Sequence, residues 1–220
     1  MQKSVWSFLA GCLVLAMLAA WCPTPVLAAD ADIYDAQSLV NALAAGADVT
    51  LWQNVTVPET TGLTVAGDST IDLNGYTLTV QAVTVDWGKQ LTVCDRTDGT
   101  GAQCGMLQVT PGTGTAIKLE RDAALVLESG NILATGADWR GTYDQVYAYS
   151  GGGIYGPLAS VTVRGGSLTA TGGSVQYVEA YRRELYAYNG ILVGQMTVDG
   201  GAVKAKGRVS GPTASSSSPM

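Results

Sequence analysis

The chain has 220 residues, with 12 lysines and arginines, 18 aspartates and glutamates, and no histidine. It is 47% hydrophobic and only 14% charged, and its 28 glycines favour a β-rich, turn-dense protein. A net charge of −6 argues against a nucleic-acid or anionic-membrane binder. The missing histidine excludes histidine acid/base chemistry, Ser-His-Asp and Cys-His triads, and nearly all zinc and haem sites. The remaining possibilities are catalysis by carboxylate, tyrosine, arginine or lysine side chains, a calcium-dependent activity, or no catalysis.

The first 28 residues have the pattern of a signal peptide. Lys3 precedes an apolar run that two prolines end, and Val26-Leu27-Ala28 places small residues before a cleavage site. Cleavage after Ala28 is therefore expected, which gives a secreted or cell-surface, extracellular protein. The segment Leu9-Ala10-Gly11-Cys12 also matches a lipobox, but the apolar run continues past Cys12 and favours the unanchored form.

A short helix is predicted over Ala36 to Ala45. Asp35 is a suitable N-cap and Gly46 a stop signal. The apolar face of the helix holds Leu39, Val40 and Leu43. Between residues 49 and 93 apolar residues alternate with threonines in short runs separated by turn residues, which predicts short β-strands. We expect the helix to cover the open N-terminal end of the β-structure that these strands begin.

Two cysteines, Cys94 and Cys104, remain after removal of residues 1–28. They bracket a polar, glycine-rich stretch, and in an exported chain they are candidates for a disulfide that closes this loop. The alternative is a pair of free, buried thiols. No later stretch approaches the ~20 apolar residues of a membrane span.

Three segments share the pattern apolar-x-apolar-x-x-Gly-x-apolar-x-Ala-x-Gly, at residues 125–136, 161–172 and 196–207. One such unit cannot bury its apolar face alone, so the repeat predicts stacked coils. The predicted fold is all-β, a right-handed parallel β-helix (solenoid) over residues 29–207 with a short N-terminal capping helix. The alignment predicts four inward ladders and one outward charged column: Ile117, Ile154, Ile191; Leu127, Val163, Val198; Ile132, Leu168, Val203; Ala134, Ala170, Ala205; and, outward, Glu128, Arg164, Asp199.

Two tyrosine-rich insertions interrupt the repeats, at residues 137–152 and 173–189. Both leave from a Thr-Gly corner and return through Tyr-Ala-Tyr, so we expect them on one side of the fold, next to each other. Aromatic rings beside arginines and carboxylates suit a sugar or a protein partner. The candidate ligand-binding residues are Trp139, Tyr143, Tyr147, Tyr149, Tyr177, Tyr181, Arg182, Tyr186 and Tyr188.

The alternative interpretation of the insertions is structural. The tyrosines then pack on one another beneath the loops as a satellite cluster. In the second insertion Tyr177, Tyr181, Leu185 and Tyr188 fall at helical spacing, which predicts a short helix that buries this face.

The chain ends in a serine-rich, low-complexity tail, residues 208–220, with no capping helix. Solenoids normally need a terminal cap. The last coil therefore exposes its edge, is covered by this tail, or continues in a longer protein.

The opening of the chain combines the short helix with residues 47–51 (ADVTL) and residues 71–78 (IDLNGYTL), and residues 151–154 (GGGI) and 161–173 (VTVRGGSLTATGG) follow later. The opening resembles that of secreted bacterial surface proteins of the pectin-lyase-like right-handed parallel β-helix superfamily. The later two segments resemble the repeats of those proteins. The resemblance implies the fold and export, and these relatives are often labelled carbohydrate-binding or adhesin-like.

The same superfamily contains polysaccharide lyases and polygalacturonase-type hydrolases, so a calcium-dependent lyase or a carboxylate glycoside hydrolase is the alternative function. The missing histidine departs from the hydrolase pattern. Asp72, in an Asp-Leu-Asn-Gly motif, is expected to cap a bend. Glu120 and Asp122 flank an arginine as a solvated, self-compensated cluster. Asp95 and Asp98 could offer oxygens to calcium, without the spacing of a known calcium loop.

We therefore expect an exported, non-catalytic surface or extracellular module, with a binding or structural role. Its partner is expected to be a polysaccharide or another surface protein, bound through the tyrosine-rich insertions. No catalytic residue, metal ligand or cofactor is predicted. Neither nucleic acid nor, after leader removal, a membrane is an expected partner.

Overall fold

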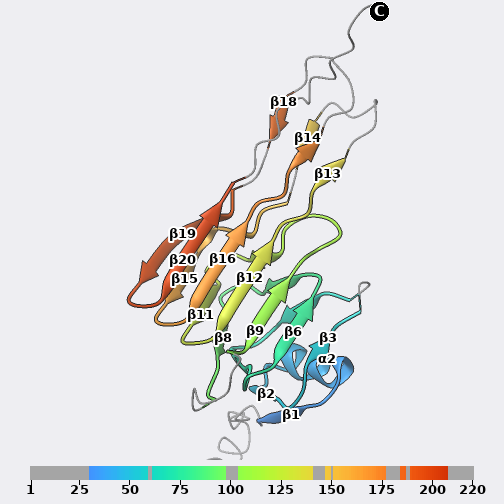
Figure 1. Ribbon diagram of the computed structural model, residues 1–220, viewed down its shortest axis with the longest axis vertical. Coiled ribbons are helices and arrows are strands. Elements are labelled where there is room, and N and C mark those ends of the chain that lie inside the picture. The colour runs from blue at the N-terminus through green and yellow to red at the C-terminus, as the bar shows by residue number, and fades with distance from the viewer. Residues whose placement is uncertain are drawn as a thin grey trace, which may run out of the picture.

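The structure is a computed structural model that describes residues 30–58, 61–97, 104–140, 147–149, 151–176, 184–186 and 189–207. The predicted leader and the serine-rich tail lie outside these ranges. In the described part the chain is mostly β, with parallel strands in curled sheets and one short helix (Figure 1). The predicted β-rich character of the chain is confirmed. No helix in these ranges is long and apolar enough to cross a membrane.

The strands lie in three rows, and the chain visits the rows in turn. The first row contains β1 (Ala31–Ile33), β2 (Val49–Leu51), β5 (Ser69–Asp72), β8 (Gln90–Cys94), β11 (Ala124–Leu127) and the later parts of β15 (Ile154–Val163) and β19 (Ile191–Val198). The second row contains β3 (Val55–Thr56), β6 (Thr77–Val80), β9 (Met106–Val109), β12 (Asn131–Thr135), β16 (Ser167–Thr171) and β20 (Ala202–Lys206). The third row contains β4 (Leu63–Val65), β7 (Val83–Val85), β10 (Ile117–Leu119) and the first parts of β15 and β19.

We call one passage of the chain through the three rows a coil. Each strand pairs in parallel with the strand that occupies the same row one coil earlier or later. β11, for example, pairs with β8 before it and with β15 after it. β15 and β19 run through the corner between the third and first rows, which joins these two rows into one sheet of ten strands within the described residues. Figure 1 shows β6, β9, β12, β16 and β20 side by side in the second row.

The alternating sequence produces this arrangement directly. In β4 and β7 the valines and leucine are buried, while Thr64 and Thr84 lie on the outer face. β-branched residues suit such a half-buried, pleated surface. The inward residues of all three rows form one continuous hydrophobic core.

The predicted register is confirmed. The four inward ladders pair as expected: Ile117 with Ile154 and Ile191, Leu127 with Val163 and Val198, Ile132 with Leu168 and Val203, and Ala134 with Ala170 and Ala205. In the outward column, Arg164 Nη1 lies 2.6 Å from Glu128 Oε1. Asp199 N donates to Val163 O and Arg164 N to Leu127 O, which places the three charged residues on successive coils.

The predicted helix is α2 (Ala36–Ala44), which ends one residue earlier than expected. The Asp35 carboxylate accepts a hydrogen bond from Ser38 N at 2.9 Å, as an N-cap does. Leu39 and Leu43 are buried, and Gly46 follows with a φ of +73°. Ala66 N, just after β4, donates to Leu43 O. The helix lies at the β1 end of the stack of coils and β20 lies at the other end (Figure 1).

Candidate functional site

The two tyrosine-rich insertions lie next to each other, as predicted. β13 (Trp139–Arg140) of the first insertion pairs in parallel with β17 (Val175–Gln176) of the second. β14 (Tyr147–Tyr149) pairs in parallel with β18 (Glu184–Tyr186). Figure 1 shows β13, β14 and β18 beyond the ends of β12 and β16, so the paired insertions project from one side of the coils.

The register of β14 and β18 defines which residues share a face. Tyr147 is opposite Glu184, and Tyr149 is opposite Tyr186. Because alternate residues of a strand share one face, these four residues lie on one face of the two-stranded ribbon. We call this set (Tyr147, Tyr149, Glu184 and Tyr186) the ribbon face. The middle residues of the two strands lie on the opposite face.

The short helix expected in the second insertion is contradicted at Leu185. Leu185, assigned to the buried face of that helix, lies in β18. The tyrosine spacing fits a helix locally, but a parallel partner strand in the first insertion supplies backbone hydrogen-bond partners that a single-segment pattern does not reveal. The candidates outside the described residues are Tyr143, Tyr177, Tyr181, Arg182 and Tyr188.

Glu184 was missed by the sequence reasoning. The signal that identifies it is spacing, because Tyr147 and Glu184 are as far apart in the sequence as Ile154 and Ile191, a pair that the repeat does predict. Glu184 is thus in register with Tyr147, next to the register pair of Tyr149 and Tyr186.

The bases of the insertions are fixed to each other. Asp138 Oδ1, in the first insertion, accepts hydrogen bonds from both Ser174 N and Ser174 Oγ at 2.7 Å. Gly173 N donates to Gly151 O at 2.8 Å, and Gly151 N donates to Ala137 O at 2.9 Å. These backbones approach so closely that a Cβ on Gly173 would lie 1.9 Å from Ala137 O. The two insertions therefore begin from a base that hydrogen bonds hold together.

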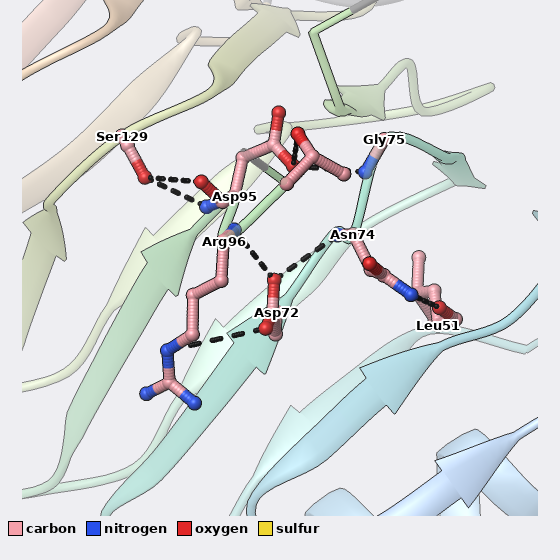
Figure 2. Close-up of polar contacts among 8 residues, drawn as sticks. Leu51, Asp72, Asn74, Gly75, Asp95, Arg96 and Ser129 are labelled. Atoms are coloured by element: carbon pink, nitrogen blue, oxygen red, sulfur yellow. Dashed lines mark hydrogen bonds and ion pairs between the residues drawn. The ribbon is translucent and has the colours of Figure 1, made fainter. Parts of the chain in front are cut away.

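A second polar cluster lies at the corner after β5 and β8 (Figure 2). Asp72 Oδ1 accepts hydrogen bonds from Asn74 N and Arg96 N, both at 3.0 Å, and Arg96 Nε lies 3.9 Å from Asp72 Oδ2. Asn74 Nδ2 in turn donates to Leu51 O of the preceding coil. The predicted bend-capping role of Asp72 is confirmed.

Asp95 is the centre of the same corner. Its Oδ1 accepts from Gly75 N at 2.8 Å and from Thr97 Oγ1 at 3.0 Å, and its Oδ2 accepts from Gly105 N at 2.6 Å. Burial acts to raise the pKa of Asp95, but the hydrogen bonds from Gly105, Gly75 and Thr97 outweigh it and hold the pKa below its usual 3.8. Both oxygens thus accept hydrogen bonds from the protein, which favours a structural role over a calcium ligand.

The two cysteines are free thiols in the structure, so the candidate disulfide is not formed there. Cys94 is buried at the end of β8, and Cys104 is exposed. Burial, and next the Asp72 carboxylate, raise the pKa of the Cys94 thiol to about 11, which makes it unreactive. The loop between the cysteines is closed instead by the hydrogen bond from Gly105 N to Asp95.

The acidic residues near β10 are self-compensated, as predicted. Lys118 Nζ lies 2.6 Å from Glu120 Oε1, and Arg121 Nε lies 3.5 Å from Asp122 Oδ2, with all four side chains exposed. Among the described residues, no three histidine, cysteine or acidic side chains gather as a metal site.

Two exposed tryptophans were also missed by the sequence reasoning. Trp52 Nε1 donates to Asp32 Oδ1 at 2.7 Å, and Trp87 Nε1 donates to Asp122 Oδ2 at 3.2 Å. They follow β2 and β7 and therefore lie at different corners of the coils. Their indoles do not form one surface, so the ribbon face remains the candidate contact site.

Neither a protein-family model, nor a curated protein, nor a solved structure matches this chain. The function is therefore inferred from the site itself.

Proposed function

We propose that the chain is an exported, non-catalytic binding or structural module of the cell surface or extracellular space, built as a right-handed parallel β-helix. Three rows of parallel strands, visited in turn by the chain, support this fold. The helix-capped start and the Asp-Leu-Asn-Gly corner at Asp72 support kinship with the secreted surface proteins of the pectin-lyase-like superfamily. Fold alone leaves the activity open, so the site has to carry the functional argument.

The observation that carries the proposed contact role is the pairing of β14 with β18. It places Tyr147, Tyr149 and Tyr186 on one face with Glu184. Tyrosine rings supply flat apolar surface with little conformational freedom to lose, and a carboxylate accepts hydrogen bonds from hydroxyl groups. A polysaccharide is the ligand that this combination suits best, with another surface protein as the second possibility.

The lyase or hydrolase alternative finds less support. Such an enzyme needs carboxylates that are free to bind calcium or to move protons. At the corner where Asp72 and Asp95 lie beside Arg96, both carboxylates accept hydrogen bonds from backbone N–H groups. This corner is accounted for by its structural role.

A glycan array probed with the exported protein tests the contact role. The expected result is binding to a restricted set of glycans, weakened by about 1–3 kcal/mol in Tyr147→Ala or Tyr186→Ala, as for an aromatic hot spot. Both variants should melt at the wild-type temperature because the coils do not depend on the ribbon. The matched control is Tyr34→Ala, an exposed tyrosine beside β1. Equal binding by all three variants, or a lowered melting temperature in the ribbon variants, contradicts the proposal.

Export is tested by expressing the full sequence in a bacterium and sequencing the N-terminus of the extracellular protein. A mature chain that begins at Ala29 is expected. Acylation at Cys12 would support the lipobox instead, and a chain that stays in the cytoplasm with residues 1–28 attached contradicts export.

A further inference from the structure

The two ends of the stack of coils differ. At the first end, α2 covers the core. At the other end, β19 and β20 pair, within the described residues, only with β15 and β16. Val198 is 52% exposed, whereas Val163, in the same ladder one coil earlier, is 0% exposed. Met196, in the inward ladder of Leu125 and Val161, is 38% exposed, and Leu192, at an outward position beside Tyr155, is also 38% exposed. The last coil thus presents inward-ladder residues and strand edges as an end face.

Some backbone N–H and C=O groups of this end face point away from the preceding coil. Asp199 N donates to Val163 O and Ala202 N donates to Gly166 O. The backbone groups of Asp199 and Ala202 therefore point toward the preceding coil. Alternate residues of a strand turn their backbone groups to opposite sides. The residues that turn theirs to the open end are therefore Met196, Val198, Val203 and Ala205.

We propose that this end face binds the same face of a second copy of the chain, in a two-fold symmetric, end-to-end dimer. A head-to-tail contact would instead place the apolar end face on the outer side of α2, where Gln37 and Asn41 are exposed and hydrogen-bonded to each other. Joining two like ends buries both apolar faces and closes the assembly. The proposal is independent of the ligand bound by the ribbon face.

Charge disfavours one way in which the two end faces can meet. If β20 lay against β20 of the second copy, Lys204 would face Lys204, a repulsive pair. A two-fold arrangement that exchanges the first and second rows instead places β19 antiparallel to β20 of the second copy. Thr197 is then opposite Lys204, Val198 opposite Val203 and Met196 opposite Ala205.

This register also matches the charged and apolar residues around the pairing. Asp199 lies diagonally from Lys204 of the second copy, within reach of a lysine side chain. The symmetry forms this ion pair twice. In the third row, Leu192 meets Leu192 of the second copy at the two-fold axis.

The serine-rich tail suits the end face less well. Residues 208–220 include two prolines, which lack the backbone N–H needed to continue a ladder, and few apolar side chains. A second copy supplies both the hydrogen-bonding edge and the apolar ladder.

Sedimentation equilibrium of the exported protein, over about a hundredfold range of micromolar concentrations, tests the proposal. A reversible monomer–dimer equilibrium is expected. Lys204→Glu places a carboxylate near Asp199 of the second copy and should raise the dimer dissociation constant about tenfold or more. The charge-swapped double variant Asp199→Lys/Lys204→Glu should restore dimerisation. Lys89→Glu, the same charge change in the coil of β8, should leave it unchanged.

Several outcomes would overturn the dimer. These are a monomer at every concentration, association that extends beyond dimers, an equal effect of Lys204→Glu and Lys89→Glu, or no rescue by the charge swap. A dimer that appears only after removal of residues 208–220 would show that the tail occupies the end face. Thermal melting of each variant verifies that the fold is intact.

Discussion

At the scale of single residues, many aspartates of this acidic chain act as connectors between coils. Asp48 Oδ1 accepts a hydrogen bond from Thr70 N at 2.6 Å, and Asp68 Oδ1 accepts one from Gln90 N at 2.9 Å. Each pair joins the corner before one first-row strand to the strand one coil later. A backbone N–H at such a corner needs an acceptor, because a buried unpaired donor is costly. The acidic surplus is therefore partly structural and is weak support for an acidic active site.

Asp95 gives a prediction about pH. Its folded pKa is lowered, so its contribution to the free energy of unfolding is complete above the unfolded pKa and is lost as the pH falls through the folded pKa. Asp95→Asn should lower the free energy of unfolding at pH 7 by about 1 kcal/mol, and this difference should shrink below about pH 4. Urea unfolding of both proteins across this pH range measures it.

The matched control for Asp95→Asn is Asp86→Asn, because the Asp86 carboxylate accepts no hydrogen bond from the described residues. It should unfold like wild type at pH 7. A pH-independent difference between Asp95→Asn and wild type would mean that the carboxylate charge is not what stabilises the corner.

Val163 and Thr162 test the inward and outward assignment. Val163 is fully buried in the ladder between Leu127 and Val198, and its neighbour Thr162 lies on the outer face. Val163→Asp buries an unpaired charge and should lower the free energy of unfolding by several kcal/mol. Thr162→Asp should lower it by about 0.5 kcal/mol or less. Thermal melting compares them directly, and similar melting temperatures would contradict the assignment.

At the scale of elements, the sequence predicts strands well where a local pattern decides them. The ladders through Val163 and Ala170 follow from the alternation and the repeat alone. The strands of the ribbon cannot be predicted in this way, because the hydrogen-bond partner of each strand lies in the other insertion. The burial of Asp72 also escapes a local pattern. Asp72 pairs with Cys94 at an outward position of the first row, and the segment after β8 covers it through Arg96 N.

The capping helix is an element whose contribution can be measured. Leu39 is fully buried in α2, which packs against β4. Leu39→Ala removes apolar contacts and leaves a cavity, so it should lower the free energy of unfolding by about 2–5 kcal/mol. Gln37→Ala, on the exposed side of the same helix, should change it little. Urea unfolding measures both, and equal stabilities would mean that the helix does not close the core.

At the scale of the whole molecule, the coils stack only if their corners come into backbone contact. The glycine that follows each first-row strand of the three repeats, at 130, 166 and 201, has a φ of +80°, +70° and +72° respectively. A Cβ on Gly166 would lie 2.0 Å from Gly130 O of the preceding coil. The repeated glycine of the sequence motif is therefore needed for clearance between coils as well as for backbone conformation.

A pair of glycine substitutions separates these two requirements. Gly114 also has a positive φ, of +76°, but a Cβ there would meet nothing within 4 Å. Gly114→Ala should therefore cost only the conformational term, about 1–2 kcal/mol. Gly166→Ala adds a clash with backbone that cannot move without parting two coils, and should cost roughly 3 kcal/mol or more. Urea unfolding of the two variants measures the difference. If the two variants are equally stable, the contact between coils at this corner does not exclude a side chain at position 166. Glycine is then required there for its positive φ alone.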